Sequence, residues 1–259
     1  MSVGRIDKIL AHEGFGTRKG IKKLLKECEV TVNGVRVFDS GTQVNPDKDI
    51  LCVDGEEVSL RKNVYLMMNK AQNVVSANKD GLHQTAFDFL SDEYKTPYLQ
   101  EHLHIVGRLD IDTEGLLFFT TDGALTHKII SPKTHFPKQY FVRLKKSESV
   151  NRQNEIKDLF YKGIHIPAEG NESEADCKSA DLIWQSENEA LLTITEGKFH
   201  QVKRMFLAVD NEVVYLKRLS IGALKLDEKL AVGEYRELTD EEVQSLMIPL
   251  SRVFYFFGK

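Results

Sequence analysis

An arginine and an aspartate stand two residues apart in the middle of the chain, between two apolar runs. Leu103–Val106 is predicted as a short strand, Gly107 follows it, and Arg108 and Asp110 precede a second predicted strand at 116–120. Glycine permits backbone angles that other residues avoid. A carboxylate held between buried strands is rigid and partly desolvated, which suits an acid, a base or a nucleophile. Spacing alone nevertheless favours a simpler interpretation, an Arg–Asp pair that braces a turn.

Three side chains further along the chain are of types that often occur in active sites. Tyr140, in the apolar run 140–144, suits a strand core or a ring that stacks on a planar substrate. Lys203 and Arg204 suit helix-surface charges or phosphate contacts. Taken singly, these residue types favour the structural alternatives.

The sequence has no pattern typical of a metal or cofactor site. The three cysteines, Cys28, Cys52 and Cys177, form no Cys-x-x-Cys pair and have no histidine in metal spacing, so we expect reduced structural thiols. The histidines nearest Asp110 lack ligand spacing, and no glycine-rich phosphate loop is present. We therefore expect no metal and no cofactor.

A helix expected at Arg18–Glu27 carries a row of cations along one face. These are Arg18, Lys19, Lys22, Lys23 and Lys26, while Ile21, Leu24 and Leu25 occupy the opposite side. A charged face is most often simply solvated, but a row of one sign also suits contact with RNA phosphates.

The elements around these residues predict two parts. In residues 1–60 we expect a helix at 5–13, the capped basic helix, a hairpin at Asn33-Gly34 and a strand at 50–53. A polar linker is expected at 59–63. The rest mixes strands and helices irregularly, which favours the α+β class. Residues 168–178 are interpreted as a surface loop, and Thr239 with Glu242 predicts a capping box.

Composition predicts a globular protein and excludes a disordered one. The 259 residues are 41% hydrophobic and 29% charged. A net charge of -4 and a pI near 6.1 give no sign of nucleic acid, so any RNA contact must come from local patches. No signal peptide or membrane span is visible. We expect a cytoplasmic monomer with no membrane partner.

Residues 3–60 resemble the RNA-binding domain named after ribosomal protein S-four. The similarity lies in Arg5–Leu10, Thr17-Arg18, Val30–Gly34 and Val53–Gly55. This domain occurs in several families that act on RNA. It implies RNA binding by the basic helix and says little about chemistry.

The stretch Gly107–Leu117 resembles the catalytic motif of pseudouridine synthases of the ribosomal small-subunit pseudouridine synthase A family. The similarity continues in order through 120–123, 131–133, Lys138-Gln139-Tyr140, 196–206 and 231–238. It implies a catalytic domain at 64–250 built on a mixed, largely antiparallel β-sheet with flanking helices, followed by a tail at 251–259. It also implies an isomerase that converts uridine to pseudouridine.

The resemblance assigns roles to individual residues. Asp110 is the catalytic carboxylate, acting either by attack on the sugar or base or by proton removal from the ribose. Tyr140 stacks on the uracil and is available to assist a proton transfer. Lys203 pairs with Asp110 and keeps it ionised. Substrate contacts are expected from Arg108, Thr113 and Arg204. His200 matches a position that we interpret as structural or RNA-facing. A further group of cations is expected to hold phosphates around the target: Lys133, Lys138, Arg143, Lys145 and Lys146.

The chain departs from the family pattern near residue 70. Ala71 and Asn73 stand where the family usually has proline and glycine, and we expect this to alter a loop beside the active site. Phe118 and Phe119 replace aliphatic residues, and the tail contains an aromatic run at 254–257.

The similarity in the last third favours one uridine of 16S ribosomal RNA as the target, within ribosomal RNA or an assembling small subunit. A synthase acting on 23S RNA is the alternative within the family. A non-catalytic RNA-binding assembly factor is a further alternative, but the complete set Asp110, Tyr140 and Lys203 argues against it.

Overall fold

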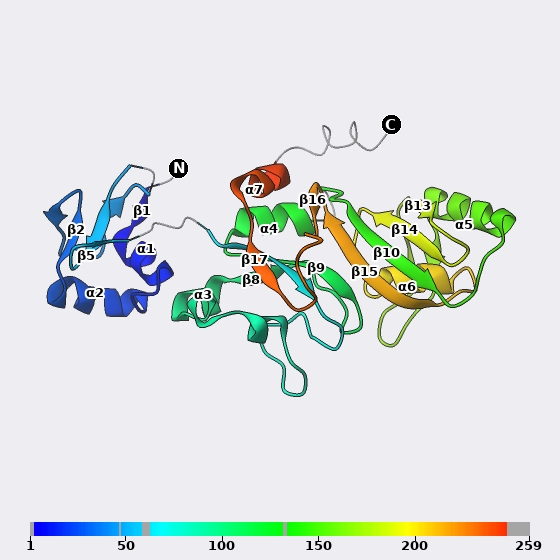
Figure 1. Cartoon of the computed structure of the whole chain (residues 1–259), viewed down its shortest axis with the longest axis horizontal. Coiled ribbons are helices and arrows are strands. Elements are labelled where there is room, and N and C mark those ends of the chain that lie inside the picture. The colour runs from blue at the N-terminus through cyan, green and yellow to red at the C-terminus, as the bar shows by residue number, and fades with distance from the viewer. Residues whose placement is uncertain (1–2, 47, 59–62, 132–133, 248–259) are drawn as a thin grey trace. The chain divides into compact units, whose positions relative to one another are not determined.

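The computed structural model describes residues 3–46, 48–58, 63–131 and 134–247. The chain divides into two units, each considered by itself (Figure 1). The first contains residues 1–64 and 90–104, and the second contains residues 65–89 and 105–259. The linker expected at 59–63, apart from Asn63, and the tail at 251–259 lie outside the described residues.

The first unit pairs two helices with small antiparallel sheets. The helices are α1 (Ile6–His12) and α2 (Arg18–Glu27), and the strands are β1 (Gly4–Arg5), β2 (Val30–Val32), β3 (Val35–Arg36), β4 (Gln43–Val44), β5 (Leu51–Val53) and β6 (Glu56–Glu57). Strands β3-β2-β5-β6 form one sheet, and β1 pairs with β4. Thr17 caps α2 by accepting from the backbone N–H of Gly20 at 3.1 Å. At the predicted hairpin, Asn33 and Gly34 have φ of 51° and 78°. These angles match a type I′ turn between the paired strands β2 and β3, so the predicted hairpin is confirmed.

A segment from the middle of the sequence belongs to this first unit. It contains the 3₁₀ turn η2 (Asp92–Tyr94) and helix α3 (Pro97–His102), which packs against α1. The Tyr98 ring lies edge-on to His12, with centroids 5.0 Å apart. Leu90 and Leu99 are also buried there. A boundary drawn only at residue 60–64 therefore differs from the structure, because apolar side chains at 90–104 complete the first unit's core.

The second unit is built on a nine-stranded mixed sheet. Its main path runs β13 (Asp181–Trp184), β14 (Glu189–Ile194), β10 (Lys138–Leu144), β15 (Val213–Ile221), β9 (Glu114–Thr120), β7 (Tyr65–Lys70) and β17 (Tyr235–Glu237). Strand β16 (Leu224–Lys225) pairs with β15, and β8 (His104–Val106) pairs with β9. Along the main path, β15–β9 is the parallel pair and the other neighbours are antiparallel. The expected mixed, largely antiparallel sheet is confirmed.

Helices flank this sheet (Figure 1). They are α4 (Gly123–Ile130), α5 (Val150–Lys162), α6 (Gln201–Leu207) and α7 (Asp240–Met247), with the 3₁₀ turn η1 (Ala86–Phe89). Leu125 and Ile129 of α4 and Leu246 of α7 join one apolar cluster with Phe118. Thr239 and Glu242 exchange backbone-to-side-chain hydrogen bonds of 2.8 and 3.3 Å, which confirms the capping box.

The segment 168–178 is only partly a loop. Within it, β12 (Ala175–Asp176) pairs with β11 (His165–Ile166), and Cys177 is buried. Part of the expected surface loop is therefore a paired strand followed by a buried thiol. Over the described ranges, no helix has the length and apolar composition needed to cross a bilayer.

Strand β10 presents two chemically different faces. The buried face of β10 contains every second residue, as the two-residue period of a strand requires: Lys138, Tyr140 and Val142. Arg143 projects from the opposite face, where it pairs with Glu189 at 2.9 Å. This alternation directs Lys138 and Tyr140 to the same side of the sheet.

Candidate active site

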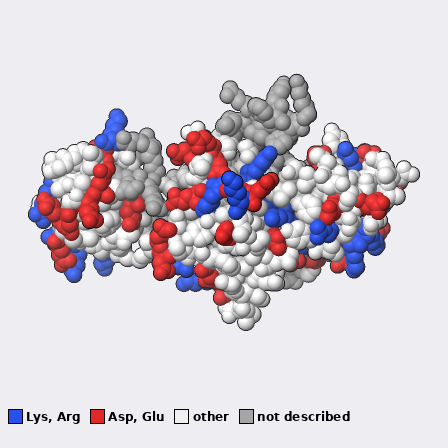
Figure 2. All heavy atoms as spheres, viewed as in Figure 1, with Lys and Arg blue, Asp and Glu red and all other residues white. Residues whose placement is uncertain are grey.

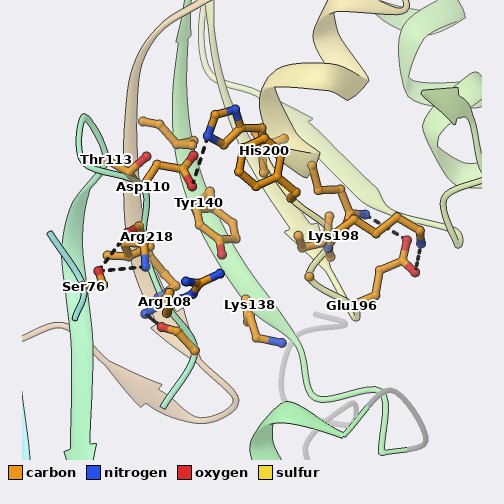
Figure 3. A pocket seen from close by; sticks show the side chains of 18 of the residues that line it. Ser76, Arg108, Asp110, Thr113, Lys138, Tyr140, Glu196, Lys198, His200 and Arg218 are labelled. Carbon is orange, nitrogen blue, oxygen red and sulfur yellow. Dashed lines mark hydrogen bonds and ion pairs between the residues drawn. The ribbon is translucent and has the colours of Figure 1, made fainter. Parts of the chain in front are cut away.

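A cavity of about 650 Å³ opens in the second unit, where four stretches far apart in sequence meet (Figure 3). Its lining includes residues from 75–76, 107–111, 138–140 and 194–202. This volume lies within the range of small-ligand sites. Asp110, Arg108, Thr113 and Tyr140 all line the cavity, so the structure brings together most of the residues singled out in the sequence.

Two nitrogen-bearing side chains, one from helix α6 and one from the residue before it, lie beside the carboxylate of Asp110. Lys203 Nζ lies 3.1 Å from Asp110 Oδ2 and 2.6 Å from Asp112 Oδ1. His200 Nε2 lies 3.7 Å from the other oxygen, Oδ1 (Figure 3). Burial disfavours the Lys203 ammonium, but its hydrogen bond to Asp112 and the charge of Asp110 outweigh burial and raise the pKa of Lys203. Lys203 is therefore a fixed positive charge beside Asp110.

The same ammonium acts on the neighbouring Asp112. Burial alone would raise the pKa of Asp112, but the hydrogen bond and charge of Lys203 lower it below its usual range. The Asp112 side chain is the more exposed of the two carboxylates. Asp112 thus anchors Lys203 from the solvent side, while Asp110 faces the cavity.

The backbone of the Asp110 loop is held by two buried polar side chains. Ser76 Oγ donates to the carbonyl of Leu109 at 2.8 Å and accepts from its N–H at 3.1 Å. Arg218 is almost fully buried, and its guanidinium donates to the carbonyls of Gly107 and Leu116, both at 2.8 Å. Gly107 has φ of 75°, the left-handed region that favours glycine. These contacts fix the backbone on both sides of Leu109, directly before Asp110.

A third group under this loop is Lys70, at the end of β7 and fully buried. Its ammonium donates to the carbonyls of Ala71 and Val74 at 2.8 and 2.7 Å, and to that of Ile111 at 3.4 Å. Burial lowers the pKa of Lys70 to about 8, although the nearby Asp112 and Asp110 favour its charged form. Lys70 therefore ties the 71–74 loop to the loop that bears Asp110.

The replacement at Asn73 falls in this loop. Asn73 has φ of 63°, and its N–H donates to the carbonyl of Ile111 at 2.7 Å. Asparagine adopts the left-handed region more readily than most residues other than glycine. Asparagine in place of the family's glycine is thus compatible with a tight turn against the Asp110 loop.

The other cavity residues differ in how they are held. Tyr140 is largely buried, whereas Arg108 is exposed at the cavity wall. Thr113 is almost fully buried, and its hydroxyl has no hydrogen-bond partner among the described residues. A buried hydroxyl of this kind favours a polar ligand or water as partner.

The position of Arg204 does not fit the substrate-binding role expected for it. It is 2% exposed, and its guanidinium donates to the backbone carbonyls of Pro167, Phe199 and Ser173 at 2.8, 3.1 and 2.6 Å. These bonds direct Arg204 into the protein, whereas the neighbouring Lys203 pairs with Asp110 and Asp112. We correct its assignment to a structural one, joining α6 to the 167–173 segment.

The cations expected to surround the target do not form one patch. Lys138 lines the cavity, where burial and the charge of Arg218 lower its pKa to about 8. Arg143 lies on the other face of the sheet, and Lys145 pairs with Glu212 at 2.6 Å. Lys146 bonds a backbone carbonyl, and Lys133 lies outside the described residues. Alternation along β10 places Lys138 and Arg143 on opposite faces, and Lys145 and Lys146 lie beyond the end of that strand.

All five cations of the basic helix are exposed on α2. Arg18 lies 3.3 Å from Asp7, and Lys23 lies 3.4 Å from Glu27. Within the described ranges, Lys19, Lys22 and Lys26 form no ion pair. On the face of the molecule in Figure 2, basic and acidic side chains are interspersed, in keeping with the small net charge.

From the sequence we interpreted His200 as structural or RNA-facing, yet the structure places it beside Asp110. Ser76, Lys70 and Arg218 were not predicted, because nothing in their local sequence indicates their contacts. Across the part of the chain that the structure describes, no three His, Cys, Asp or Glu side chains are arranged to hold a metal ion.

Comparisons with known proteins match both units of the chain. The family described as RNA pseudouridylate synthase matches residues 64–208, and the S4 domain matches residues 4–50. The RNA pseudouridine synthase YtzG of Bacillus subtilis is 46% identical over 95% of this chain and 99% of its own length.

Two further relatives are named ribosomal small subunit pseudouridine synthase A. The protein of Vibrio cholerae is 42% identical, covering 93% of this chain and 99% of its own, and that of Escherichia coli is 37% identical, covering 94% and 100%. A crystal structure of a pseudouridylate synthase, 36% identical, aligns with a TM-score of 0.61 over 93% of this chain and 99% of that one.

Proposed function

This chain belongs to the RNA pseudouridylate synthase family, and from that premise we propose that it isomerises a single uridine of 16S ribosomal RNA to pseudouridine. The choice of small-subunit RNA is supported by relatives named for that subunit at 37–42% identity over nearly their whole length. The observation that carries the site assignment is the Asp110 carboxylate, held at the cavity by Lys203 at 3.1 Å.

The reaction breaks the bond between uracil N1 and ribose C1′, turns the base, and joins C5 to C1′. Asp110 acts on the nucleotide either by attack or by removing a proton from the ribose. Lys203 places a positive charge beside its carboxylate in both routes. Tyr140 supplies a ring for the uracil to stack on, and Arg108 and Thr113 contact the nucleotide around it.

The target uridine must leave its stack to reach Asp110, because the carboxylate lines a cavity within the second unit. Extrusion costs a few kcal/mol, and less when the nucleotide is unpaired. Uracil offers few edges for recognition, so selection of one uridine must come from RNA contacts around the cavity. The S4 domain, with the exposed lysines of α2, supplies phosphate contacts outside the catalytic unit.

We propose that the partner is folded 16S RNA or an assembling small subunit, met in the cytoplasm by a monomeric enzyme. Uridine and pseudouridine are isomers, so the net reaction consumes no redox equivalent and no phosphate bond energy. We therefore propose catalysis without a metal or cofactor. Full activity in excess chelator is the expected result, and activity abolished by chelator and restored by a divalent metal would refute this point.

The function is tested by incubating the purified protein with 16S RNA, 23S RNA, partly assembled small subunits and short loop fragments, and mapping pseudouridine in each. One modified position in 16S RNA or in assembling subunits is expected. Modification confined to 23S RNA would refute the small-subunit target and favour the large-subunit alternative. Equal modification of short fragments would refute selection by RNA shape.

A further inference from the structure

His200 occupies a constrained position at the edge of the cavity. It directly precedes α6, and its φ of 46° lies in the left-handed region, which non-glycine residues seldom adopt. Its ring stacks on Phe199, with centroids 3.8 Å apart and planes 19° apart. A backbone strained in this way persists only where surrounding contacts impose it. Here the contacts aim the imidazole at Asp110.

Both ring nitrogens face a carboxylate. Nδ1 lies 3.0 Å from Glu169 Oε1, and Nε2 lies 3.7 Å from Asp110 Oδ1. An ionised carboxylate only accepts hydrogen bonds, so the contact with Glu169 places the proton of a neutral ring on Nδ1. Nε2 then carries a lone pair at the cavity. The 3.7 Å separation exceeds a hydrogen bond, as expected when a lone pair faces a carboxylate oxygen.

This arrangement has the features of a general base. A histidine whose far nitrogen is held by a carboxylate is fixed in tautomer and orientation, so that its other nitrogen can accept a proton. The second oxygen of Glu169, Oε2, is buried and has no partner among the described residues, so the carboxylate is not neutralised by another hydrogen bond there. His200 itself lines the cavity.

The isomerisation requires such a proton acceptor. When uracil C5 has bonded to C1′, C5 still carries its hydrogen, and the ring has a double bond between N1 and C6. Removal of the C5 proton lets the C–H electron pair form the C5–C6 double bond. The N1–C6 pair then moves to N1, which takes up a proton. One proton therefore passes from C5 to N1, and nothing else is consumed.

We propose that His200, oriented by Glu169, is the catalytic base that removes the C5 proton and returns it to N1, an inference that rests on the proposed isomerisation. Its position suits the step, because the new C5–C1′ bond forms on the nucleotide that Asp110 engages, and His200 is Asp110's neighbour on the cavity side. Glu169 acts through His200 and is a positioning residue.

The other basic groups near Asp110 suit this step less well. Lys203 is bound to two carboxylates, and its raised pKa keeps it protonated. The guanidinium of Arg218 donates to the Gly107 and Leu116 carbonyls, beneath the loop. Asp110 is itself engaged with the nucleotide in either route, and Tyr140 serves as the ring on which the uracil stacks.

The test uses the full-length enzyme, 16S RNA with hydrogen or deuterium at uracil C5, and the variants His200→Asn and Glu169→Gln. Asparagine tolerates the left-handed backbone at 200 and can still bond Glu169, but it cannot act as the base. We expect His200→Asn to lower kcat on the order of 10²–10⁴-fold. A primary isotope effect should appear or grow, while RNA affinity stays unchanged. Glu169→Gln, at a half-exposed side chain, should lower kcat less and raise the isotope effect in the same direction.

His165→Asn is the matched control, because His165 also faces carboxylates, Asp176 at 2.8 Å and Glu174 at 3.6 Å, but on the exposed β11–β12 hairpin. It should match the wild type. If His200→Asn slows turnover with no rise in the isotope effect, or does not slow it, the proposal is overturned while wild-type turnover still supports the function. A wild-type enzyme that forms no pseudouridine refutes both.

Discussion

Lys203 Nζ lies 3.1 Å from Asp110 Oδ2, joining the first turns of helix α6 to the loop before β9. The two residues are far apart in sequence and meet in the fold, where α6 packs against β15 and β15 pairs with β9. A lysine held between Asp110 and Asp112 is a permanent counter-charge for the reacting carboxylate. The same pair provides a matched test, since one carboxylate faces the cavity and the other faces solvent.

Asp110→Asn should lower turnover at least about 10³-fold, because an amide is nearly isosteric but supplies neither nucleophile nor base. Asp112→Asn, which also contacts Lys203, should retain most of the activity. Single-turnover pseudouridine formation measures both, with melting temperature and RNA affinity expected to stay near wild type. Equal losses in the two variants would show that Asp110 acts only through Lys203.

Ser76→Ala should weaken both folding and catalysis. It removes the hydroxyl that serves the N–H and carbonyl of buried Leu109, at a cost of about 1–3 kcal/mol in the free energy of unfolding. Displacement of Asp110 by a fraction of an ångström should lower kcat by up to about 10²-fold, with little change in KM. Urea unfolding and steady-state kinetics measure these effects, and Ser147→Ala, at an exposed position before α5, is the control. Unchanged kcat would exclude a role for Ser76 in placing Asp110.

Stability should respond to pH through Lys138. Burial, together with Arg218, lowers its folded-state pKa from 10.5 to about 8. Between pH 8 and 10.5 the unfolded chain therefore binds more protons, so this group makes the protein more stable as pH rises. The free energy of unfolding of the wild type should rise relative to Lys138→Met by up to about 1.4 kcal/mol per pH unit.

Urea unfolding at pH 7, 8, 9 and 10 measures this difference. Lys157→Met, at an exposed position on α5, should run parallel to the wild type. If the curve for Lys138→Met is also parallel to that of the wild type, burial does not lower the pKa of Lys138 at the cavity.

The basic helix should contribute to the salt dependence of RNA binding. Lys22→Gln with Lys26→Gln should reduce the slope of log affinity against log salt by between about 1.4 and 1.8, or 0.7–0.9 for each phosphate left without its lysine. Lys22 and Lys26 are chosen for substitution instead of Arg18, because the Arg18 guanidinium pairs with the buried Asp7. The double variant Lys157→Gln and Lys162→Gln on α5 removes the same charge elsewhere. Identical slopes for both double variants would mean that α2 faces solvent in the complex.

Local signals in the sequence determined the elements that depend on neighbouring residues. The Asn33-Gly34 turn, the Thr17 cap and the Thr239–Glu242 capping box were all predicted, because their hydrogen bonds and backbone angles involve residues within a few positions. The order of motifs likewise indicated the family and the candidates Asp110, Tyr140 and Lys203. The contact between Asp110 and Lys203 followed from that resemblance and from no local pattern.

Tertiary structure alone decided which polar residues turn inward. Arg204 and Lys203 are adjacent on α6, yet one is buried on backbone carbonyls and the other pairs with Asp110. Residues 90–104 join the first unit because their apolar side chains pack on α1. Lys70 is buried beneath the Asp110 loop and His200 is aimed at Asp110. Each outcome depends on partners distant in sequence, because burial and hydrogen bonding are set by what the chain folds against.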